Sequence, residues 1–141
     1  MTFLLDTCVI SELVAKQPNL HVVQWVDSID EDKLFLSAIT IGEIKRGIEK
    51  LADSSRKSAL AEWLEGDLLI RFTDRILPID VPVMLVWGQL TADLEKQGRR
   101  MSAIDSLIAA TCLQARLDLV TCNERDFAHS GITVVNPWEQ Q

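Results

Sequence analysis

Four acidic side chains lie at positions where they could share a divalent metal ion. Asp6 ends a short apolar run, Glu43 and Asp105 lie near the starts of segments with helical patterning, and Asp126 follows another apolar run. Carboxylate oxygens are the ligands that Mg²⁺ and Mn²⁺ prefer in proteins. Such an ion lowers the pKa of a bound water and aligns it for attack on a phosphodiester. The four acids therefore predict metal-assisted hydrolysis of a phosphodiester bond.

Each acid also has a simpler explanation, which is stabilisation of a helix start. Three of them lie in motifs that resemble capping boxes or capped first turns: Thr40-x-x-Glu43, Ser102-x-x-Asp105 and Asn123-x-x-Asp126. Asp6 could cap the helix expected after it. An acid in the first turn stabilises a helix by about 0.3–1 kcal/mol without any catalytic role. Taken one residue at a time, capping and metal binding both remain open.

Short apolar runs alternate with longer segments of helical periodicity. We expect strands at 2–5, 34–37, 75–79, 117–121 and 133–135, and helices at 7–15, 19–29, 40–51, 54–69, 81–97 and 102–115. Pro78 places the third strand near an edge or a strand end. Strands that alternate with helices form β-α-β units, so the pattern predicts an α/β fold with a parallel sheet covered on both faces.

The expected topology brings the acids together. Ligand sites in such folds lie at the carboxyl ends of the strands. Asp6 directly follows the first strand, Glu43 lies one turn into the helix after the second, and Asp126 shortly follows the fourth. Like charges at one edge repel, and a bound cation relieves that repulsion. The convergence favours a Mg²⁺ or Mn²⁺ site over four independent caps.

Composition predicts a single globular domain spanning residues 1–141. Apolar residues make up 48% and charged residues 25% of the chain. No apolar run approaches the roughly 20 residues that span a bilayer, so we expect no membrane partner. The N-terminus lacks a basic opening and carries Asp6 inside its apolar stretch, which predicts a cytoplasmic protein without a signal peptide. Three cysteines without a C-x-x-C motif, and only two histidines, indicate reduced thiols rather than disulfides or structural zinc.

The charge balance leaves the substrate open. The chain has 14 basic and 21 acidic residues, a net charge of −7, which alone counts against nucleic-acid binding. Omitting the four candidate metal ligands leaves −3 (−7 + 4), and a bound cation would reverse the local sign. The acidic surface also suits a basic protein partner.

Four sequence blocks, in order, resemble a known family. They are Leu-Leu-Asp-Thr-Cys at 4–8, Ile-Gly-Glu-Ile at 41–44, Ala-Ile-Asp-Ser-Leu-Ile-Ala-Ala at 103–110 and Val-Thr-Cys-Asn-Glu-Arg-Asp-Phe at 120–127. Together they resemble the PIN domain and, more narrowly, the VapC-like toxins of bacterial toxin–antitoxin pairs. The match covers nearly the whole chain, and its strength comes from the order of the four blocks.

The resemblance implies a three-layer α/β/α sandwich with a central parallel sheet of about five strands. It implies Mg²⁺-dependent endoribonuclease activity on an RNA substrate, a homodimer, and inhibition by a small cognate antitoxin that often covers the acidic site. By position, Asp6 and Asp105 would be the principal metal ligands, and Glu43 and Asp126 would complete the catalytic site.

Other polar residues near these motifs are candidates for substrate binding. The resemblance implies that Thr7 could hydrogen-bond within the site and that Asn123 lies beside the last acid. Arg46 and Arg100 lie near the acids in sequence and could hold phosphates. Cys122 departs from the family pattern, which often has a basic or polar residue there.

Three other functions compete with this one. An aspartyl-phosphate enzyme of the haloacid-dehalogenase type would need a second Asp two residues after Asp6, where this chain has Cys8. A non-catalytic binding module of the PIN fold would not need four intact acids. A DNA-directed nuclease of the wider fold usually has more acids and longer insertions than this chain.

Overall fold

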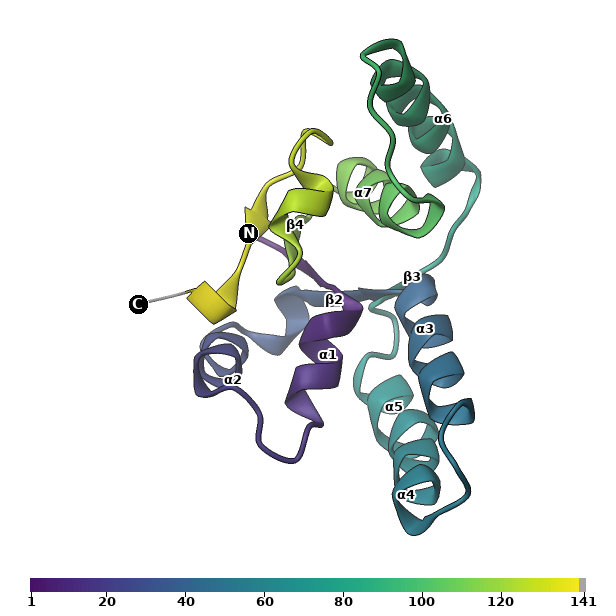
Figure 1. The fold of residues 1–141 in the computed structure, drawn as a ribbon. Coiled ribbons are helices and arrows are strands. Elements are labelled where there is room, and N and C mark those ends of the chain that lie inside the picture. Colours follow the sequence, from purple (N-terminus) through teal and green to yellow (C-terminus); the bar gives the residue numbers. More distant parts are fainter. Residues whose placement is uncertain (140–141) are drawn as a thin grey trace.

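A parallel sheet of five strands lies at the centre of the computed structural model, which describes residues 1–139 (Figure 1). Its strands are β1 (Phe3–Leu5), β2 (Leu34–Ser37), β3 (Ile76–Leu77), β4 (Asp118–Val120) and β5 (Val134–Val135). They are ordered β3-β2-β1-β4-β5, and every neighbouring pair is parallel. The predicted parallel sheet is therefore confirmed, with β1 in the middle.

Helices cover both faces of this sheet. They are α1 (Thr7–Leu13), α2 (Leu20–Asp27), α3 (Ala38–Glu49), α4 (Ser55–Trp63), α5 (Leu69–Arg71), α6 (Val81–Lys96) and α7 (Ala103–Ala115). Short helical turns are η1 (Glu31–Lys33), η3 (Glu124–Phe127) and η4 (Pro137–Glu139). Figure 1 shows α6 and α7 on one side of the sheet and α1 to α5 on the other, which gives the three layers.

Two apolar clusters hold the layers together because side chains alternate along each strand. Phe3 and Leu5 of β1 pack into one cluster with α1, α2 and α3. Leu4, between them, packs into the other cluster with α7 and Phe127 of η3. The central strand is thus buried on both faces, as a parallel sheet requires.

The region after α3 differs most from the sequence prediction. The region expected as one helix at 54–69 consists of three consecutive segments. The α-helix α4 ends at Trp63, the π-helical segment η2 (Leu64–Leu68) follows, and the single turn α5 comes last. Leu64, Leu68 and Phe72 are all buried, so the chain keeps packing on the core through this irregular turn. The strand expected at 75–79 shortens to two residues at the sheet edge, where Pro78 predicted it. Within residues 1–139, no helix is long and apolar enough to cross a membrane.

Candidate active site

Asp6 is the buried centre of the acidic group. It directly follows β1, and the residue is only 7% exposed. One carboxylate oxygen accepts the Thr7 N–H at 2.8 Å, which caps α1, and the other accepts the Thr121 hydroxyl at 2.8 Å. Burial raises the pKa of Asp6, the two hydrogen bonds lower it, and the nearby charges of Glu43 and Asp105 raise it further.

Glu43 lies on α3, and its side chain contacts Thr7, the residue after Asp6. This helix begins at Ala38 because the Ser37 hydroxyl accepts the Ile39 N–H at 3.1 Å. Glu43 therefore lies in the second turn, and the predicted capping box with Thr40 is wrong. The Glu43 side chain instead accepts the Thr7 hydroxyl at 2.5 Å.

Asp105 lies in the first turn of α7, where capping and site roles coexist. The Ser102 hydroxyl accepts the Asp105 N–H at 3.1 Å, so the predicted cap forms. Burial raises the pKa of the Asp105 carboxyl, the Ser102 side chain opposes this, and the charges of Asp126 and Glu43 raise it again. The cap thus leaves the carboxylate facing other acids.

Asp126 arrives on η3, after β4. Its side chain is exposed, and its N–H donates to the Asn123 carbonyl at 3.1 Å. The Asn123 side chain does not cap this turn, so the predicted capping role of Asn123 is wrong. Its own N–H donates to the Thr121 hydroxyl at 3.1 Å, which ties the turn to the residue that holds Asp6.

The four predicted acids form one electrostatic cluster. Glu43 and Asp105 each raise the pKa of Asp6, while Glu43 and Asp126 each raise that of Asp105. Within residues 1–139, none of the four forms an ion pair with a lysine or arginine. The fold therefore concentrates negative charge without supplying a cation of its own.

The donor set fits a hydrated hard cation. Its donors are carboxylate and hydroxyl oxygens, which Mg²⁺ and Mn²⁺ prefer. In the described part of the chain, no three Asp, Glu, His or Cys side chains are grouped closely enough to hold one ion by themselves. Mg²⁺ usually keeps several waters and is held by one or two carboxylates, so a site for it does not require a group of three. Burial and neighbouring acids disfavour the charged forms of Asp6 and Asp105, so these two carboxylates would be relieved most by a bound cation.

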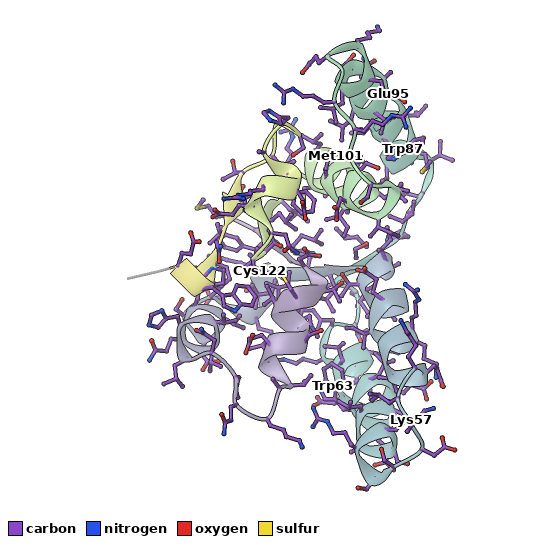
Figure 2. All side chains as sticks on the ribbon, in the orientation of Figure 1. Lys57, Trp63, Trp87, Glu95, Met101 and Cys122 are labelled. Carbon is purple, nitrogen blue, oxygen red and sulfur yellow. The ribbon has the colours of Figure 1, made fainter. Side chains whose placement is uncertain are left out.

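The predicted basic residues differ in their surroundings. Arg46 is exposed on α3, one turn after Glu43. Arg100 is also exposed, but it lines a separate hollow between α6 and the start of α7, together with Trp87, Glu95 and Met101 (Figure 2). None of the four acids lines that hollow. Arg46 thus shares a helix with Glu43, whereas Arg100 lines a hollow that contains none of the four acids.

A largely apolar groove begins at the acidic cluster. Thr7 and Glu43 lie at one end, and the groove runs between α1, α3 and α4 over Ile48 and Leu60 to Trp63, which Figure 2 labels. A surface of this kind can hold an apolar segment of a partner whose polar end meets the acids.

Comparisons with known proteins agree with this architecture. A family model described as PIN domain matches residues 3–131. The chain belongs to the PIN-domain family. Toxin FitB of Neisseria gonorrhoeae is 40% identical over 135 residues, which is 96% of this chain and 97% of FitB. VapC ribonuclease Y4jK of Sinorhizobium fredii is 33% identical, over 96% of each chain.

A comparison with solved structures agrees with this family assignment. The crystal structure of FitAcB from Neisseria gonorrhoeae matches with a TM-score of 0.94 and 39% identity, covering 99% of this chain and 100% of that one. The predicted family and fold class are confirmed.

The sequence analysis did not predict the contacts that two buried threonines make in this site. Thr121 is fully buried and joins Asp6 to the turn that carries Asp126. Thr40 is also buried, and its hydroxyl oxygen lies 3.1 Å from that of Thr7. The one available signal for Thr121 was a polar residue directly after a buried strand.

Proposed function

We propose that the chain is the toxin of a toxin–antitoxin pair and a metal-dependent endoribonuclease that hydrolyses RNA with a metal-activated water. The observation that carries this proposal is the cluster of four acids, two with raised pKa values, which has no cationic partner in the described structure. Membership of the PIN-domain family supports it, as do relatives named as a toxin and as a ribonuclease.

In this proposal Asp6 and Asp105 are the principal ligands of Mg²⁺ or Mn²⁺, and Glu43 and Asp126 complete the site. The bound ion supplies an activated water and offsets the negative charge of the phosphate. The metal dependence rests on the oxygen donor set and on the charge that the fold leaves unbalanced.

The chain contributes by fixing the ligands before substrate arrives. Thr121 and the Thr7 N–H hold the Asp6 carboxylate from both sides, and the Thr7 hydroxyl holds Glu43. Fixed ligands need less reorganisation when the ion and substrate bind. Arg46 and Asn123 are the candidates for contacting RNA, because each lies three residues from an acid of the cluster along the chain. Arg100 would contact RNA only if the bound strand extended to the hollow between α6 and the start of α7.

The first test compares Mg²⁺-dependent cleavage of RNA and DNA by purified protein. Asp6→Asn and Asp105→Asn should each lower RNA cleavage by about a hundredfold or more, because each removes a ligand charge while keeping the side-chain shape. Asp27→Asn, which changes an exposed acid on α2, is the matched control and should keep activity. Cleavage of DNA alone would instead support the DNA-directed nuclease, and no cleavage by folded protein would support the binding module.

We also propose a cognate antitoxin as partner. The groove from Glu43 to Trp63 and the net charge of −7 both suit a protein segment with apolar and basic residues. RNA and such a partner would both be met in the cytoplasm, which is where we expect the chain to act.

Induced expression should arrest growth, and Asp6→Asn at a matched protein level should not. Equal growth with soluble natural protein and no antitoxin would contradict a toxic role.

A further inference from the structure

Two cysteines lie next to each other beside the acidic cluster. Cys8 is in the first turn of α1, two residues after Asp6, and Cys122 follows Thr121 at the end of β4. Although 114 positions separate them, the Cys122 N–H lies 3.4 Å from the Cys8 sulfur, which it contacts as a hydrogen-bond donor. The Cys8 sulfur also lies 3.5 Å from the Thr121 hydroxyl oxygen. Figure 2 shows Cys122 close to the start of α1.

The two thiols differ in how easily an oxidant can reach them. Cys122 is exposed and Cys8 is half-buried, while Cys112 is buried on α7. All three cysteines are free in the structure. An exposed thiol backed by a second thiol from another element has the arrangement of an attacking and a resolving cysteine.

We propose that Cys8 and Cys122 form a reversible disulfide when a low-molecular-weight disulfide is present. The Cys122 thiolate attacks one sulfur of that oxidant, a mixed disulfide forms, and one small thiol leaves. The Cys8 thiol then gives its proton to the departing small thiolate as its sulfur attacks the Cys122 sulfur, which forms the intramolecular bond and releases the second small thiol. The protein loses two protons and two electrons, and the oxidant gains them as its two thiols.

This bond would join the segments that carry two of the proposed metal ligands. The start of α1 holds Asp6, and the turn after β4 holds Asp126; at present hydrogen bonds through Cys8 and Thr121 connect them. The Cys8 sulfur now accepts the Cys122 N–H at 3.4 Å. A bond of about 2.05 Å between the two sulfurs would hold the two segments at a different separation and so shift Asp6 relative to Asp126. We therefore expect weaker Mg²⁺ binding in the oxidised form, a consequence that rests on the proposed function.

Thiol counting tests the disulfide without any reference to activity. The full chain is incubated with oxidised glutathione, quenched, unfolded and assayed for free thiols. The three thiols of the reduced chain should fall to one, and peptide mapping should identify a Cys8–Cys122 link. Tm should rise by about 5–10 °C because the bond closes a long loop. Dithiothreitol should reverse both changes.

Single variants separate this disulfide from other modifications. Cys8→Ser and Cys122→Ser should each abolish the rise in Tm, whereas Cys112→Ala should retain it. A stable glutathione adduct on Cys122, or a link that involves Cys112, would overturn the proposal.

A second arm tests the consequence for the metal site. Mg²⁺ binding by calorimetry and RNA cleavage should both decrease in the oxidised chain and recover with dithiothreitol, while Cys122→Ser stays insensitive to the oxidant. Unchanged Mg²⁺ binding in a chain proven to be cross-linked would overturn this consequence. If neither form cleaves RNA, the proposed function fails, yet thiol counting still decides the disulfide.

Discussion

Two carboxylates of the acidic cluster should lower the stability of the metal-free folded chain. The pKa values of Asp6 and Asp105 are raised, first by burial and then by neighbouring acids. A carboxyl whose pKa is higher in the folded than in the unfolded state binds protons more readily when folded. Its contribution therefore becomes unfavourable as pH rises from the ordinary carboxyl range through the raised pKa. At neutral pH these charged acids should destabilise the chain unless a cation is bound.

Asp105→Asn should therefore stabilise the metal-free protein. The substitution removes a charge that two neighbouring acids repel and keeps the Asp105 N–H that the Ser102 hydroxyl accepts. In EDTA at neutral pH, Tm should be higher than that of the natural chain. Added Mg²⁺ should raise Tm of the natural chain and have little effect on the variant. A variant that is less stable in EDTA, with the natural response to Mg²⁺, would show that Asp105 is a structural residue.

The same acids predict a distinctive pH dependence. Lowering the pH from neutral into the range just above the ordinary carboxyl pKa should reduce the stability gap between Asp105→Asn and the natural chain, because Asp105 becomes protonated there. Mg²⁺ binding should weaken over the same range, since protons compete for the ligands. Urea unfolding of both proteins across this range, in EDTA, measures the gap. A gap independent of pH would contradict the assigned repulsion.

Residue types and positions identified the candidate acids, but they did not identify the hydrogen-bond partners of those acids. Asp6 and Asp105 were predictable because each lies at a recognisable strand end or helix start. Thr121 was not, because its role depends on β4 lying beside β1, a contact across 115 positions. The alternative role of Glu43 in a capping box with Thr40 is excluded only by the structure, because Ser37 starts α3 earlier.

At the scale of elements, apolar periodicity predicted the strands and helices well where they are long or fully buried. It overestimated the length of β3, which keeps two of the five residues expected at 75–79 and depends on contacts that periodicity does not record. The Arg75 guanidinium donates to the carbonyls of Glu31, Leu34 and Arg71. It also lies over the Phe72 ring, 4.7 Å from its centroid. One side chain thus joins η1, β2 and α5 at the sheet edge.

Arg75→Gln should lower the free energy of unfolding by weakening this edge of the sheet. Its side chain is only 16% exposed, so the loss leaves several backbone carbonyls with fewer partners and should cost about 2–4 kcal/mol of unfolding free energy. Arg71→Gln is the matched control: that side chain is half-exposed and pairs with the same Glu31, so its loss should cost about 1 kcal/mol or less. Urea unfolding of the two variants compares them, and equal costs would refute the special role of Arg75.

At the scale of the whole molecule, one apolar surface has no partner within the described chain. Val81, Met84 and Leu85 are 71%, 40% and 73% exposed, and their spacing of three and four residues places them on one face of α6. Figure 1 shows α6 at the outer end of its layer, away from the sheet. Soluble monomers rarely expose contiguous apolar surface, so this face is where we expect the predicted homodimer to form.

Leu85→Glu should therefore convert the dimer to a monomer, because a two-fold interface would bring the two introduced charges into one apolar contact. Sedimentation velocity over a range of concentrations measures this change. Leu113→Glu, at a less exposed apolar position on α7, is the control and should remain dimeric. If the natural chain is dimeric and Leu85→Glu stays dimeric, the interface lies on another face. If the natural chain is monomeric at all concentrations, the predicted homodimer is wrong and the exposed α6 face does not pair with a second copy.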